Sequence, residues 1–96
     1  MTQPIAVVAT ITAHPGHRQA VIDALRTAVA AVRLEQGCEL YVLHEDMDEP
    51  NRLVMIERWS SMADLEAHGR GAALATLGGA LKDRADLHVS KLIPVS

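Results

Sequence analysis

Segments with the hydrophobic periodicity of strands alternate with segments that have the periodicity of helices along the 96 residues, and their order limits the folds that this chain can adopt. Ile5–Ala13 is apolar and rich in β-branched residues, which predicts a buried strand, and it stops at a His-Pro-Gly sequence typical of a turn. From residue 17 to about residue 35, apolar residues recur at helical spacing while charged residues fall on another face. This pattern predicts an amphipathic helix that is closed by Gly37. Its apolar stripe is Val21, Leu25, Ala28 and Val32.

The second half of the chain continues the alternation. Residues 40–46 and 53–59 are strand-like runs joined by an acidic loop with a Pro-Asn pair, which predicts an antiparallel hairpin. Ser61 precedes a short predicted helix over residues 62–68, and Asp64 follows it at the spacing of a capping box. A second helical piece is predicted at about residues 72–82, and residues 87–94 form a last strand.

This order, β-α-β-β-α-β, is typical of the split βαβ or ferredoxin-like α+β fold. The length suits a single domain over residues 1–96, because a second hydrophobic core needs a longer chain. Right-handed crossovers place both helical regions on one face of the predicted four-stranded sheet.

Both faces of that sheet are nonetheless apolar, because neither parity of the hairpin is polar. One parity holds Tyr41, Leu43, Val54 and Ile56, and the other holds Leu40, Val42, Leu53 and Met55. A face without helices would meet water, so something must cover it. Two-fold homodimers are the commonest soluble assembly, so we expect a homodimer whose sheets form a barrel-like core. The alternative is a monomer in which one helix crosses the far face.

Composition excludes several classes of protein. Aromatic residues make up 2% of the chain and its net charge is -3, so it lacks a stacking platform for bases and a basic surface for nucleic acid. The single cysteine, Cys38, allows no internal disulfide and has no activating neighbour, and no Cys/His cluster has metal-ligand spacing. No basic-then-apolar leader is seen, and apolar runs fall far short of the roughly 20 residues of a membrane span. We therefore expect a cytoplasmic protein with no membrane contact.

Four side chains are candidates for chemistry: His44, Glu57, Trp59 and His68. If residues 46 and 51 pair across the hairpin, Leu40 lies opposite Glu57, and His44 shares a face with Glu57 and Trp59; a slip of one residue would separate them. An imidazole and a carboxylate beside an indole could bind and deprotonate an acidic phenol or enol. The alternatives are a buried polar pair that fixes the register and a structural His68. His14, His17 and His88 are expected at the surface.

Several short segments, in this order, resemble the antibiotic biosynthesis monooxygenase family, whose members are small dimeric α+β barrel proteins and include quinol monooxygenases. The resemblance runs from Val7 to Val95. The segments that carry it are TITAHPG at 10–16, EQGC at 35–38, YVLHED at 41–46, Pro50-Asn51, ERW at 57–59 and LEAH at 65–68.

The resemblance implies a ligand cavity in each subunit between the sheet and the helices, with Trp59 and His68 in its lining and His44 and Glu57 nearby. It also implies catalysis without flavin, haem or metal, because the deprotonated substrate supplies the electrons to dioxygen. His44 or His68 would act as base or hydrogen-bond donor, Trp59 would shape the pocket and donate a hydrogen bond, and Glu57 would orient the histidine. The remaining residues expected in the substrate pocket are Tyr41, Met55 and Leu65.

Three functions follow as hypotheses. The first is a cofactor-independent monooxygenase that oxidises a small phenolic or quinol, polyketide-like substrate. The second is a non-catalytic, small-ligand-binding or stress-associated dimer of the same fold. The third is a haem-binding or haem-degrading protein, which is less favoured because haem-degrading relatives carry an Asn on the first strand and Asn51 is the only one here. The absence of Phe and the single Tyr favour a small quinol or a non-aromatic ligand.

Overall fold

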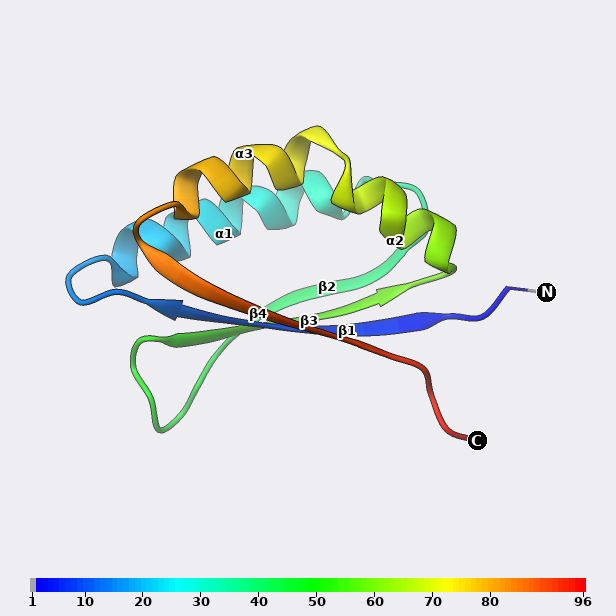
Figure 1. The fold of residues 1–96 in the computed structure, drawn as a ribbon, viewed down its shortest axis with the longest axis horizontal. Helices are drawn as coiled ribbons and strands as arrows, with labels where there is room; N and C mark the ends of the chain where they lie inside the picture. Colours follow the sequence, from blue (N-terminus) through cyan, green and yellow to red (C-terminus); the bar gives the residue numbers. More distant parts are fainter. Residues whose placement is uncertain (1) are drawn as a thin grey trace.

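The computed structural model describes residues 2–96 as one four-stranded sheet with three helices over one of its faces (Figure 1). The elements are β1 (Ile5–Ala13), α1 (Arg18–Val32), β2 (Cys38–Glu45), β3 (Arg52–Trp59), α2 (Met62–Gly69), α3 (Ala72–Leu81) and β4 (Ala85–Leu92). Within these described residues, no helix has the length and apolar character needed to cross a membrane.

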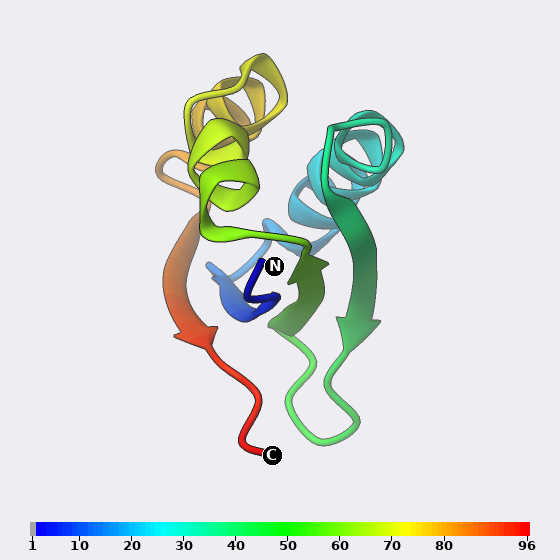
Figure 2. The same cartoon turned by 90° about the vertical axis from the view of Figure 1, so that its right-hand side faces the viewer.

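The strand order is β2-β3-β1-β4, and all three neighbouring pairs are antiparallel. This confirms the split βαβ topology predicted from the order of periodicities. In Figure 2, α1 stands over the β2 side of the sheet, whereas α2 and α3 stand over the β4 side. In the part of the chain that the structure describes, no helix crosses the opposite face of the sheet. The alternative in which one helix of a monomer covers that face is therefore wrong.

The core lies between the sheet and the helices. Along β1, every second residue from Ile5 to Ala13 is buried, as expected for a strand with one face against a core. The predicted stripe of α1 is also buried, which confirms the helical periodicity. The capping box at α2 is confirmed as well, because Ser61 Oγ accepts the backbone N–H of Asp64 at 3.1 Å.

Two element boundaries differ from those predicted. The helix α1 ends at Val32 rather than near residue 35, because a turn over residues 33–37 finishes with Gly37 at a φ of 80°. The strand β4 begins at Ala85 and ends at Leu92, about two residues earlier than predicted. Its start is set by a tight turn in which Arg84 donates its N–H to the Leu81 carbonyl at 2.9 Å.

The hairpin register is shifted by one residue from the predicted one. Glu45 lies opposite Leu53 and Tyr41 opposite Glu57, whereas the prediction set residue 40 opposite residue 57. The cause is the turn at Asp46, whose Oδ1 accepts the backbone N–H groups of Asp48 at 2.9 Å and Glu49 at 3.0 Å and so lengthens the loop. Because side chains alternate between faces, the shift moves the even-numbered residues of β2 to the opposite face.

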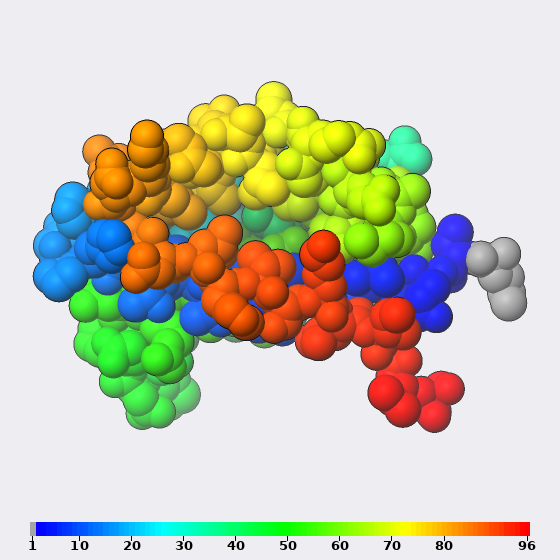
Figure 3. Space-filling view, viewed as in Figure 1, coloured from blue at the N-terminus to red at the C-terminus, as the bar shows by residue number. Residues whose placement is uncertain are grey.

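The sheet face without helices is apolar and uncovered. The even-numbered residues of β2 lie opposite those of β3, so Leu40, Val42, Val54 and Ile56 share this face. Leu40 and Ile56 are 41% and 37% exposed, which is high for large apolar side chains on central parts of strands. The hairpin loop and the segment after β4 project on this side of the molecule (Figure 3). Both faces of the hairpin therefore carry apolar residues, as expected, but the predicted grouping is wrong. The register shift sets Leu40 and Val42 with Val54 and Ile56, and it sets Tyr41 and Leu43 with Leu53 and Met55.

The turn between α1 and β2 generates a stability prediction. Gly16 and Gly37 both have a positive φ, but only at Gly37 would a Cβ atom collide with a neighbour, the side chain of Asp64. Gly16→Ala should lower the free energy of unfolding by about 1–2 kcal/mol, the cost of the left-handed conformation for alanine. Gly37→Ala should lower it by about 1–2 kcal/mol more, because the displaced Asp64 loses its contacts at the start of α2. Urea unfolding of both variants measures the difference, and equal losses would contradict this account.

Candidate functional site

A cavity of about 220 Å³ lies between the sheet and the α2–α3 pair. Two polar side chains in its wall are buried, Glu57 and His68, and two are exposed, Glu66 and Lys91. Its apolar wall is formed by Val7, Met62, Leu65, Leu74 and Val89. A mostly apolar cavity with a few convergent polar groups is the usual form of a small-molecule site.

His68 is held on three sides. Its Nδ1 lies 2.7 Å from Oε1 of Glu35, a short contact between an imidazole and a carboxylate. Its ring stacks on Trp59 with the ring centroids 4.5 Å apart and meets Tyr41 edge-on at 5.8 Å. Only 6% of the residue is exposed. Because Nδ1 is occupied, Nε2 is the ring nitrogen left for a ligand in the cavity.

Glu57 and Trp59 form the second polar pair of the site. They are two residues apart on β3, so both point to the helix-covered face, where Trp59 Nε1 donates to Glu57 Oε1 at 2.9 Å. Burial raises the pKa of Glu57 above its ordinary value, and the nearby carboxylate of Glu35 adds to this; the indole hydrogen bond and His68 act in the opposite direction. Glu57 is therefore a carboxyl whose proton is held more tightly than in water.

The start of α2 places His68 over the sheet. The Asp64 carboxylate accepts hydrogen bonds from the hydroxyls of Ser60 at 2.6 Å and Ser61 at 3.0 Å. The same side chain lies against Gly37, and Ser60 donates its N–H to the Gly37 carbonyl at 2.9 Å. These contacts join α2 to the turn that follows α1, and the same turn carries Glu35. The position of Glu35 beside His68 is thus a consequence of how α2 is anchored.

The structure brings together Glu57, Trp59 and His68, but it separates His44 from them. His44 lies opposite Val54 on the uncovered face, is exposed, and has Nδ1 3.0 Å from the carbonyl of Val42. The predicted grouping of His44 with Glu57 is wrong, because it depended on the register that the Asp46 turn shifts.

The other predicted pocket residues are placed as follows. Leu65 lines the cavity. Three predicted pocket residues are buried on the helix-covered side of the sheet but do not line the cavity: Trp59, Tyr41 and Met55. The Trp59 ring, none of whose surface is exposed, stacks on the ring of His68 instead. Burial beside Glu57 and Glu35 raises the pKa of the Tyr41 hydroxyl, which keeps it protonated.

Sequence reasoning missed Glu35, the hydrogen-bond partner of His68. Glu35 and His68 are 33 residues apart, and no local spacing connects them. The one clue in the sequence is a carboxylate two residues before the helix-closing Gly37, where the chain must turn back toward the sheet.

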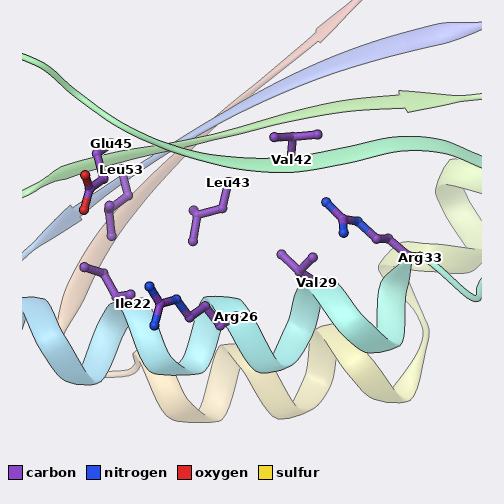
Figure 4. A pocket seen from close by; sticks show the side chains of 8 residues that line it. All are labelled: Ile22, Arg26, Val29, Arg33, Val42, Leu43, Glu45 and Leu53. Carbon is purple, nitrogen blue, oxygen red and sulfur yellow. The ribbon is translucent and has the colours of Figure 1, made fainter.

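A larger hollow of about 470 Å³ lies between α1 and the hairpin strands (Figure 4). Arg26 of α1 and Arg33, which follows the last residue of α1, extend along it toward the strands, and Arg33 donates Nε–H to the Tyr41 carbonyl at 3.1 Å. Both arginines are exposed, and no buried polar group points into this hollow. The smaller cavity beside His68 therefore has the better arrangement for chemistry, despite its size.

Neither a metal-binding cluster nor an activated thiol is present among residues 2–96. Among residues 2–96 there is no group of three His, Cys, Asp or Glu side chains that could hold a metal ion. Cys38 is half-buried, and burial together with Glu35 and Glu57 raises the pKa of its thiol, which opposes thiolate formation.

Known proteins share this fold and parts of this sequence. PA3566 from Pseudomonas aeruginosa has a crystal structure with a TM-score of 0.93 and 33% identity, covering 100% of this chain and 98% of that one. Rv0793 from Mycobacterium tuberculosis has a TM-score of 0.91 and 27% identity, covering 97% and 96%.

Two further findings concern the sequence. Probable quinol monooxygenase YgiN of Escherichia coli K12 is 40% identical to this chain over 74 residues, covering 67% of this chain and 71% of the relative. The sequence pattern described as antibiotic biosynthesis monooxygenase matches residues 4–76. This chain therefore belongs to the antibiotic biosynthesis monooxygenase family.

Proposed function

We propose that this protein is a monooxygenase that uses dioxygen to oxidise a small phenolic or quinol substrate in the cavity beneath α2 and α3. The observation that carries the proposal is His68: its Nδ1 is taken by a carboxylate, and its ring lines an apolar cavity beside a second carboxyl, Glu57. The family and the likeness to YgiN support the same reaction class. A positioned base is what deprotonation of a phenol requires, and a hydrogen-bond donor nearby stabilises the anion that forms.

The size of the cavity narrows the substrate. It measures about 220 Å³, and a cavity of about 150 Å³ holds one benzene ring. A single substituted ring therefore fits, whereas a polycyclic substrate does not fit without movement of the wall. The absence of Phe and the presence of Leu65 and Leu74 in the wall are consistent with a small ring rather than a stacked polycycle.

The reaction balances without an external reductant. Nε2 of His68 accepts the proton of a ring hydroxyl, and the resulting phenolate donates electrons to dioxygen. One oxygen atom forms a bond to a ring carbon and the other leaves as water, so that a hydroquinone and dioxygen yield a hydroxyquinone and water. All four electrons come from the substrate. Glu57 lines the same cavity and can hydrogen-bond a second ring hydroxyl.

The open cavity supports this proposal over a non-catalytic dimer of the same fold that binds no small molecule at this place. In such a protein, side chains such as Met55, Met62 or Leu74 would be expected to fill the space. Instead, Met62 and Leu74 line the cavity and Met55 lies in the core. A bound small molecule can therefore reach His68.

We also infer that a second copy of this chain covers the uncovered sheet face. Leu40, Val42, Val54 and Ile56 form an apolar patch over β2 and β3 on that face, and such patches mark interaction surfaces. A two-fold axis would set the same patch against itself and form the barrel-like core.

We further propose that residues 1–96 act as a single domain in the cytoplasm. The first strand, β1, pairs with the last strand, β4, so segments from both ends of the sequence belong to one sheet. Cys38 has no cysteine partner, which suits a reducing compartment.

The first prediction concerns oxygen uptake with single-ring hydroquinones. The wild type should consume oxygen above the rate of autoxidation, and His68→Ala should lower the rate about 10²–10⁴-fold, the usual contribution of a general base. His17→Ala, in the turn before α1, should keep the wild-type rate, and circular dichroism should show that both variants fold. An inactive wild type would contradict the proposal, and haemin titration would then test for the Soret shift of a haem-binding protein. An unaffected His68→Ala variant would remove His68 from the reaction.

The second prediction concerns the raised pKa of Glu57. A carboxyl whose pKa is higher in the folded state stabilises the fold fully at low pH and loses that contribution as pH rises through the folded pKa. Glu57→Gln keeps an oxygen for the Trp59 indole and cannot ionise. Relative to this variant, the wild type should lose stability as pH rises from about 4.5 toward the raised pKa, with a constant difference above it. Urea unfolding between pH 4 and 8 checks this, and parallel profiles for the two proteins would argue against a raised pKa.

The third prediction concerns the uncovered face. Light scattering after gel filtration should give a mass of twice the 10.3 kDa chain. Ile56→Lys should give the monomer, because it places a charge at the centre of the apolar patch. Leu34→Lys is the matched control, since Leu34 is 88% exposed just after α1 and away from the patch. A monomeric wild type, or a dimeric Ile56→Lys variant, would rule out this interface.

A further inference from the structure

Glu35 contacts the functional histidine from outside the cavity. It lies in the turn after α1 and is not part of the cavity wall, yet its Oε1 is 2.7 Å from His68 Nδ1. The side chains are 24% and 5% exposed, so this contact is largely shielded from water. A shielded, short contact between a carboxylate and an imidazole is stronger than an exposed ion pair.

We propose that Glu35 is a positioning residue, which holds the proton of His68 on Nδ1 and thereby leaves the lone pair of Nε2 available to the cavity. This inference rests on the proposed function, in which His68 is the base. Glu35 has no contact with the substrate and acts through His68 alone.

The chemistry of the two groups determines the tautomer. An ionised carboxylate only accepts hydrogen bonds, so the nitrogen beside it must carry the proton. The tautomer of a neutral histidine is set by the hydrogen bond that one of its nitrogens makes. When Nε2 takes a proton from the substrate, the carboxylate also stabilises the imidazolium that forms, as in hydrolase triads.

The contact with Glu35 also selects the orientation of the His68 ring. The stacking on Trp59 and the edge-on contact with Tyr41 fix the plane of the ring, and a half-turn within that plane would break the hydrogen bond between Nδ1 and Glu35. Glu57, the other carboxyl nearby, is hydrogen-bonded to the Trp59 indole instead. The two carboxyls therefore serve different nitrogen atoms, one on His68 and one on Trp59.

Glu35 is itself fixed. Its backbone N–H donates to the Val32 carbonyl at 2.9 Å, and its carbonyl accepts the N–H of Cys38 at 3.3 Å. These two bonds fix the main chain from which the Glu35 carboxylate reaches His68.

The test combines ring-nitrogen NMR with kinetics. In the wild type without substrate, the ¹⁵N signals of neutral His68 should show Nδ1 protonated and Nε2 unprotonated. Glu35→Gln should populate the Nε2-protonated tautomer, because a carboxamide can donate to Nδ1 as well as accept from it. The same variant should lower kcat at least tenfold with KM within about twofold, as expected for a residue that acts outside the cavity.

Glu49→Gln is the matched control. It removes the same charge from the exposed hairpin loop and should leave the His68 tautomer and kcat unchanged. Protonated Nε2 in the wild type, or a Glu35→Gln variant with wild-type tautomer and kcat, would overturn the inference. If the wild type consumes no oxygen, the proposed function fails, while the NMR signals still decide whether Glu35 sets the tautomer.

Discussion

The site depends on the attachment of α2 to the turn that follows α1. Asp64 packs against Gly37 and accepts the hydroxyls of Ser60 and Ser61, while Glu35 reaches His68 from the same turn. These contacts fix the short helix at the angle that leaves a cavity below it. Without these contacts a helix of 8 residues would be less stable, because helices this short are marginally stable in the absence of tertiary contacts.

The two faces of the sheet differ in the residues they present and in what covers them. The helix-covered face carries the hydrophobic core, which includes Leu65 of α2 and Leu77 of α3, and it carries the cavity at the α2–α3 side. The uncovered face presents Val54 and Ile56 beside a row of polar residues, His44, Thr10 and His88, but that row lines neither the α2–α3 cavity nor the hollow beside α1. In the proposed dimer, one face would therefore support assembly while the other supports binding, and each could change without disturbing the other.

Much of this arrangement could be predicted from the sequence. The element order, the buried stripe of α1 and the capping box at Ser61 depend on local spacing, which a sequence displays directly. The hairpin register could not be predicted, because both parities of the strands are apolar and the pattern fits either alignment. The Asp46 turn decides it, and with it the exclusion of His44 from the site. Contacts between segments that are distant in the sequence could not be predicted from local spacing either, so the hydrogen bond between Glu35 and His68 was not predicted.

The proposed reaction requires that a single-ring quinol binds in the cavity against His68. A crystal of the protein can be soaked with 1,4-hydroquinone under anaerobic conditions, so that no turnover occurs, and its structure determined. We expect one ring between Leu65 and Leu74, with a hydroxyl at a hydrogen-bonding distance of about 2.6–3.2 Å from His68 Nε2. A ring bound instead in the hollow beside Arg26 and Arg33, or an empty cavity at a saturating concentration, would contradict it.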